Sequence, residues 1–125
     1  MLKYLVFMDK IHEQGSIDWK KAEQMVSEFL ERKKYKIVAR NYRTPFGEVD
    51  IIARCGDVYI FVEVKSGTGT RIKPSERVDS EKYKRISMSA EYYLRGKAYS
   101  KAQIDVAEVI GNEINYYEDI GWEFL

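Results

Sequence analysis

The segment Val58–Lys65 constrains the fold most strongly, because it is the most β-prone stretch of the chain and begins apolar on both of its faces. Successive side chains of a strand point to opposite faces, so one face carries Val58, Ile60, Val62 and Val64 and the other Tyr59, Phe61, Glu63 and Lys65. A strand of this kind is covered on both sides, as in a sheet flanked by helices. Two charged residues, Glu63 and Lys65, emerge together on one face at its end.

Turn and capping signals divide the rest of the chain into elements with the order α-β-β-β-α-β-β. In chain order we expect a helix after Ser16–Asp18 that ends near Lys33, strands at Tyr35–Asn41, Val49–Ala53 and Val58–Lys65, a helical region from Pro74-Ser75 to about Arg95, and strands at Ile104–Ile110 and Ile114–Tyr117. This order predicts an α/β domain with a mixed central β-sheet flanked by helices. We expect an N-terminal arm over residues 1–17 and a single domain over residues 18–125.

The charge of the chain is nearly balanced, at +1, but it is unevenly distributed along the sequence. Residues 32–43 carry basic side chains and no acid, whereas residues 103–125 carry acids and no Lys or Arg. Such a distribution gives either one basic and one acidic face or a solvated surface without function. A single cysteine, Cys55, fits a reducing compartment, and the apolar run Leu2–Met8 is too short to span a membrane. We therefore expect a cytoplasmic protein that does not bind membranes.

The strand Val49–Ala53 carries an acid where its pattern calls for an apolar residue. Glu48, Asp50 and Ile52 should share one of its faces, although Asp is among the poorest strand formers. Pairing with the following strand in a hairpin brings the start of the first strand beside the end of the second. We therefore expect Asp50 and Glu63 to be neighbours.

The first helix adds a third acid to this region. Trp19, Val26 and Leu30 form its apolar stripe at helical spacing, and Glu23 lies inside that stripe, so its carboxylate should point toward the sheet. Buried carboxylates repel one another and lose hydration, at a cost on the order of several kcal/mol each. A divalent cation such as Mg²⁺ would offset that cost, because it binds carboxylate oxygens, waters and phosphate oxygens. The alternative is an exposed charge pair on an edge strand and a Glu23 head group that reaches water.

Two motifs in combination carry a family resemblance: Gly47–Ala53, which reads GEVDIIA, and Phe61–Lys65, which reads FVEVK. Together they resemble the bacterial YraN-like family, whose members are relatives of PD-(D/E)xK nucleases and resemble archaeal Holliday-junction resolvases in fold. The resemblance extends over roughly residues 20–120 and implies a restriction-endonuclease-like core. The chain departs from the family in a longer leading stretch and in residues 71–74, which lack the usual Phe-Gly.

The resemblance implies a metal-dependent endonuclease that hydrolyses phosphodiester bonds and leaves a 3′-hydroxyl and a 5′-phosphate. Asp50 and Glu63 match the metal-binding carboxylates of the family, and Lys65 matches its catalytic lysine. Glu23 matches the helix glutamate, and Glu48 matches a family acid whose role is less settled. We expect Mg²⁺ or Mn²⁺ to be held by Asp50, Glu63 and the backbone carbonyl of Val64, with Glu48 as a further candidate ligand.

Candidate nucleic-acid contacts are Arg43, Lys82 and Arg85, the last two one turn apart on the predicted second helix. Solvated helix charge is an equally good explanation of these three residues. Because no sequence-reading motif is present, we expect a nucleic acid selected by shape rather than by sequence, with DNA favoured over RNA.

Two other functions compete with the nuclease. One is a non-catalytic nucleic-acid-binding or scaffold module that keeps the nuclease fold; the complete set of Asp50, Glu63 and Lys65 argues against it. The other is an interaction protein built on the apolar run Leu5–Phe7 of the arm. That arm could also pair two subunits, and a homodimer is a hypothesis at this point.

Overall fold

The computed structural model describes residues 3–7, 19–67 and 78–121 of the 125-residue chain. Its elements are β1 (Lys3–Phe7), α1 (Trp19–Arg32), β2 (Lys36–Thr44), β3 (Gly47–Cys55), β4 (Val58–Ser66), α3 (Ser80–Leu94), β5 (Lys101–Ile110) and β6 (Glu113–Tyr117). From α1 onward they follow the predicted order α-β-β-β-α-β-β, and β1 precedes them. The predicted α/β class with a mixed sheet is thereby confirmed.

The described strands form one six-stranded sheet in the order β1-β6-β5-β4-β3-β2. Strands β4 and β5 run parallel, and every other pair of neighbours runs antiparallel. The hairpin β3–β4 closes through a two-residue turn, Gly56-Asp57. Gly56 has a φ of 62°, and short hairpin turns of this kind favour glycine because it adopts a positive φ readily. Strand β4 is thus an interior strand, as its two apolar faces predict.

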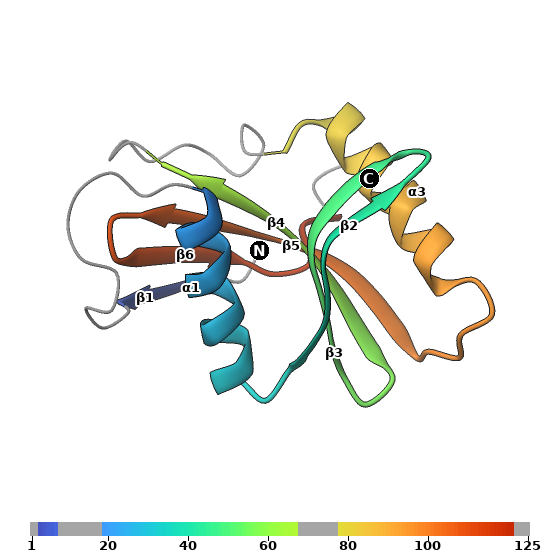
Figure 1. The fold of residues 1–125 in the computed structure, drawn as a ribbon, viewed down its shortest axis with the longest axis horizontal. Helices are drawn as coiled ribbons and strands as arrows, with labels where there is room; N and C mark the ends of the chain where they lie inside the picture. The colour runs from blue at the N-terminus through green and yellow to red at the C-terminus, as the bar shows by residue number, and fades with distance from the viewer. Residues whose placement is uncertain (1–2, 8–18, 68–77, 122–125) are drawn as a thin grey trace.

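The sheet separates two hydrophobic cores, one under each helix (Figure 1). In the first core Ile60 and Val62 of β4 pack with α1, and in the second Tyr59 and Phe61 of the same strand pack with α3. This arrangement accounts for the continuous apolar run, because each face of β4 has a helix to cover it. Side chains from α1, α3 and β4 can therefore meet at the end of β4, where the strand leaves these two cores.

Strand β1 is an element that the sequence analysis did not predict. Its five residues pair antiparallel with β6, from Lys3 opposite Tyr117 to Phe7 opposite Glu113. The apolar run Leu5–Phe7, predicted to belong to an arm, therefore lies in an edge strand of the chain's own sheet. The homodimer remains a hypothesis.

Helix α3 begins at Ser80 and ends at Leu94, close to the predicted end. Asp79 caps its first turn, where the side-chain Oδ1 accepts the backbone N–H of Lys82 at 2.8 Å. The predicted start of this helical region at Pro74-Ser75 lies outside the described residues, as does the predicted cap of α1 at Ser16–Asp18. The cap fixes the turn of α3 that carries Lys82.

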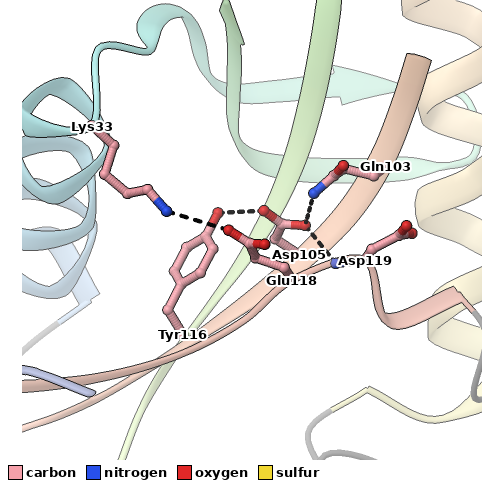
Figure 2. Close-up of polar contacts among 6 residues, drawn as sticks. All are labelled: Lys33, Gln103, Asp105, Tyr116, Glu118 and Asp119. Atoms are coloured by element: carbon pink, nitrogen blue, oxygen red, sulfur yellow. Dashed lines mark hydrogen bonds and ion pairs between the residues drawn. The ribbon is translucent and has the colours of Figure 1, made fainter. Parts of the chain in front are cut away.

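A buried polar network joins β5 to the end of the described chain (Figure 2). Asp105 is almost completely buried and accepts three hydrogen bonds, from Tyr116 Oη at 2.6 Å, Gln103 Nε2 at 3.0 Å and the backbone N–H of Asp119 at 2.8 Å. Burial raises the pKa of Asp105 to about 6, and the three donors oppose that rise. Satisfied donors and acceptors of this kind hold Tyr116 and Asp119 in one arrangement.

An ion pair beside this network connects the end of α1 to the residues that follow β6. Lys33 Nζ lies 3.3 Å from Glu118 Oε2, and both side chains are partly buried (Figure 2). The two interactions together tie the first helix and the last strand to β5.

Replacement of Tyr116 by Phe should lower the free energy of unfolding by about 1–3 kcal/mol, because Asp105 Oδ2 loses its buried donor. Urea denaturation of both proteins measures the difference. Tyr99→Phe is the matched control, since Tyr99 is 48% exposed and should change stability by less than about 0.5 kcal/mol. Equal stability of Tyr116→Phe and the wild-type chain would show that the Tyr116–Asp105 hydrogen bond contributes nothing.

Candidate active site

A cleft of about 520 Å³ opens where α1 meets strands β2, β3 and β4. Its lining residues are Trp19, Glu23, Asn41, Arg43, Glu48, Asp50, Glu63, Val64 and Ser66. All four acids singled out in the sequence are among them. The predicted convergence of acids from the first helix and two neighbouring strands is therefore present in the structure.

The alternation of side chains along β3 breaks at Asp50. Ile51 packs in the core under α1, and Val49, two residues before it, packs in the core under α3. On the paired strand β2, Asn41 has a φ of 50°, which Asn adopts more readily than most residues. The register places Asn41 beside Asp50, so both strands depart from regular geometry at the same rung. The simple alternation assumed for Glu48, Asp50 and Ile52 does not hold here.

Asn41 also positions Glu23. Its Nδ2 donates to Glu23 Oε1 at 3.2 Å, and the Glu23 side chain is buried, as its place in the apolar stripe predicts. Burial raises the pKa of Glu23, and the hydrogen bond from Asn41 opposes that rise. The sequence analysis missed Asn41, although an Asn inside a predicted strand is a signal of special backbone geometry.

Asp50 lies beside Glu63 and is held by the backbone of β4. Its Oδ2 accepts the N–H of Val64 at 2.8 Å. Burial, and then the charge of Glu63, raise the pKa of Asp50 from 3.8 to about 7, while the Val64 hydrogen bond opposes the rise. Asp50 therefore exchanges its proton near neutral pH, a property that is common in functional sites.

Glu63 is buried and interacts with two lysines. Lys82 Nζ of α3 lies 2.9 Å from Glu63 Oε2, and Lys65 Nζ lies 3.7 Å from the same oxygen. Glu63 and Lys65 therefore lie together at the end of β4, as predicted from the alternation of its side chains. Lys82 is paired with the buried carboxylate of Glu63, and its role as a phosphate contact stays a prediction.

The two predicted arginines form ion pairs with acids other than Glu63. Arg43 lines the cleft with its side chain 87% exposed, and its Nε is 3.7 Å from Glu48 Oε2. Arg85 Nη1 pairs with Glu81 Oε1, one turn earlier on α3, at 3.4 Å. Of these two arginines, Arg43 lines the cleft together with the four acids. Nucleic-acid contacts by Arg43, Lys82 and Arg85 stay predictions.

Trp19 is a correction to the sequence analysis. The helical spacing placed it in the buried stripe of α1, but it is 56% exposed and lines the mouth of the cleft. Stripe members further along α1, such as Val26 and Leu30, are buried as expected. The periodicity misplaced Trp19 because the first residue of a helix can extend beyond the core that its later turns cover.

Residues 22–109 match the model described as uncharacterised protein family UPF0102. A UPF0102 protein of Fervidobacterium nodosum is 51% identical over 111 residues, which cover 86% of this chain and 84% of the relative. The chain belongs to the UPF0102 family. This confirms the YraN-like resemblance drawn from the GEVD and FVEVK motifs.

Two further members of the family share a smaller fraction of identical residues with this chain. A UPF0102 protein of Thermotoga maritima is 43% identical over 105 residues, covering 83% of this chain and 96% of the relative. One of Wolinella succinogenes is 42% identical over 101 residues, covering 80% and 92%. These names state no activity, so function must be argued from the site.

Among the described residues, no helix is long and apolar enough to cross a membrane.

Replacement of Asp50 by Asn should stabilise the fold at pH 8. A carboxyl whose pKa is raised in the folded state contributes stability when protonated, and that contribution is lost as the pH rises through about 7. Asn is neutral at every pH and keeps an oxygen for the Val64 N–H. Thermal unfolding at pH 8 should therefore show a higher Tm for the variant, with a gain on the order of a few kcal/mol that shrinks at pH 5.

Glu31→Gln, at an exposed position of α1, is the control for loss of one negative charge and should show no such pH-dependent gain. If the wild-type chain were more stable than Asp50→Asn at pH 8, the argument that the ionised Asp50 carboxylate destabilises the fold would be contradicted.

Proposed function

We propose that this protein is a metal-dependent endonuclease that hydrolyses phosphodiester bonds in nucleic acid, with DNA selected by shape rather than by sequence. The observation that carries the proposal is the pair Asp50 and Glu63, two neighbouring carboxylates that line one cleft, Glu63 buried and Asp50 partly buried. A structural role would be served better by apolar residues at these positions, because charged groups withdrawn from water cost free energy.

The donor set suits a hard divalent cation. Within residues 3–7, 19–67 and 78–121, no three acidic, His or Cys side chains are grouped closely enough to form a complete metal site. Mg²⁺ does not require one, since it is commonly bound by one or two carboxylates together with waters and substrate phosphates. Asp50 and Glu63, with the carbonyl of Val64, supply such a partial set, and Glu23 and Glu48 line the same cleft.

A bound Mg²⁺ or Mn²⁺ would polarise the scissile phosphate and lower the pKa of a bound water. The residues of the chain perform the other tasks. The Val64 N–H holds one oxygen of the Asp50 carboxylate, so the side chain is ordered before a ligand binds. Glu23, held by Asn41, adds a hydrogen-bond acceptor from α1 that can orient a water.

Lys65 is the residue that we assign to the attacking water. Its ammonium group is paired with Glu63 at 3.7 Å and is 37% exposed, so it is held near the carboxylates and still accessible from solvent. From there the ammonium group can orient the nucleophile or stabilise negative charge that develops on the phosphate, whereas removal of a proton from the nucleophile would require Lys65 to be in its neutral amine form. Lys82, paired with the same Glu63 oxygen, positions that carboxylate and adds positive charge near it.

Positive charge for the nucleic-acid backbone is available at the cleft from Arg43, which is 87% exposed. Contacts of this kind fix the position of a substrate without reading its bases. Because such contacts do not depend on the base sequence, they support a substrate that is selected by its shape, such as branched or partly unpaired DNA.

The nuclease proposal predicts metal-dependent cutting that requires Asp50, Glu63 and Lys65. Labelled single-stranded, duplex, flap and four-way-junction DNAs, with matched RNAs, would be incubated with EDTA, Mg²⁺ or Mn²⁺. We expect cleavage with metal only, and a loss of at least about 100-fold in Asp50→Ala, Glu63→Ala and Lys65→Ala.

Glu31→Ala, an exposed acid of α1 outside the cleft, serves as the matched control and should cut at the wild-type rate. Binding without cutting under every condition, unchanged in the three variants, would overturn the nuclease and identify a non-catalytic nucleic-acid-binding module.

A further inference from the structure

Trp19 is a large aromatic side chain exposed at the mouth of the carboxylate cleft. Three large hydrophobic side chains are markedly exposed in the described part of the chain, namely Trp19 at 56%, Phe46 at 39% and Tyr99 at 48%. Trp19 alone among these three lines the cleft with Asp50 and Glu63. Exposure of an indole ring is unfavourable in water, and such a side chain beside a polar site is typical of ligand contacts.

Positive charge accompanies this ring. Lys20 Nζ lies 5.5 Å from the centre of the Trp19 ring, and the exposed Arg43 lines the same cleft. Aromatic rings next to cationic side chains form the binding surface for single-stranded nucleic acid, in which bases stack on the rings and phosphates meet the cations.

The size of the cleft and the geometry of stacking restrict the ligand further. At about 520 Å³, the cleft has the volume of a site for a small molecule, which suits one strand better than two. A base inside a duplex is already stacked on both faces, so its face is accessible to Trp19 only if the nucleotide is unpaired or turned out of the helix.

We propose that Trp19 is a stacking platform for an unpaired base next to the scissile phosphate, so that the site takes nucleic acid with a single-stranded segment at the point of cutting. This inference rests on the proposed function and specifies its substrate. The base lies over Trp19, the backbone passes Arg43, and the phosphate reaches Asp50 and Glu63 at the base of the cleft.

Fluorescence provides a test that does not depend on cutting. The chain has two tryptophans, Trp19 and Trp122, so Trp122→Phe leaves Trp19 as the single indole. Combined with Asp50→Asn, which blocks hydrolysis and removes one negative charge, this protein would be titrated with a single-stranded 12-residue oligothymidine and with a blunt hairpin duplex. We expect the single strand to quench Trp19 emission with saturation and the blunt duplex to leave it unchanged.

A second measurement uses anisotropy of a labelled oligothymidine. Trp19→Leu should weaken its binding by about 5- to 100-fold, as loss of one stacked base does, while Trp19→Phe retains part of the affinity. Tyr99→Leu, which removes an exposed aromatic outside this cleft, is the control and should bind normally. Circular dichroism and thermal unfolding verify that each variant is folded.

The proposal would be overturned by unchanged single-strand binding in Trp19→Leu, by equal quenching with the blunt duplex, or by the absence of oligonucleotide binding. Trp19-dependent binding by a wild-type chain that never cuts would support the stacking platform and contradict the nuclease. The two proposals can therefore fail separately.

Discussion

The site depends on one unfavourable contact, that of the partly buried Asp50 with the buried Glu63. Removal from water raises the pKa of Asp50 to about 7, and the neighbouring charge of Glu63 adds to that rise. The fold compensates with the Val64 N–H on Asp50 and with Lys82 and Lys65 on Glu63. These partners reduce the cost without removing it, and under the proposed function a cation bound among the four acids that line the cleft would reduce it further.

Strand β4 makes this arrangement possible because it is packed on both faces. Helix α1 covers one face and brings Glu23, and α3 covers the other and brings Lys82. The two hydrophobic cores fix the helices relative to the strand, so charged side chains from three separate elements meet where β4 leaves the cores. Preorganisation of this kind holds catalytic groups in position before a substrate binds.

The sequence predicted the class of fold and the acids of the cleft because both follow from local patterns. Regular periodicity placed Glu23 correctly, whereas Trp19, the first residue of the helix, lies beyond the core. The break of alternation at Asn41 and Asp50 depends on backbone geometry that no repeat encodes. The pairing of Lys82 with Glu63 joins residues distant in the chain, and a charge pattern read along one helix cannot predict such a pairing.

Calorimetric titration of the wild-type chain with Mn²⁺ at pH 7, in two buffers of different ionisation enthalpy, tests most directly whether Asp50 and Glu63 form a metal site. A metal that takes the place of the proton on Asp50 should release protons at this pH and almost none at pH 9, since the pKa of Asp50 is about 7. Binding with proton release that follows this pH dependence is the result that we predict. An absence of binding, or binding with no proton release at pH 7, would contradict the account.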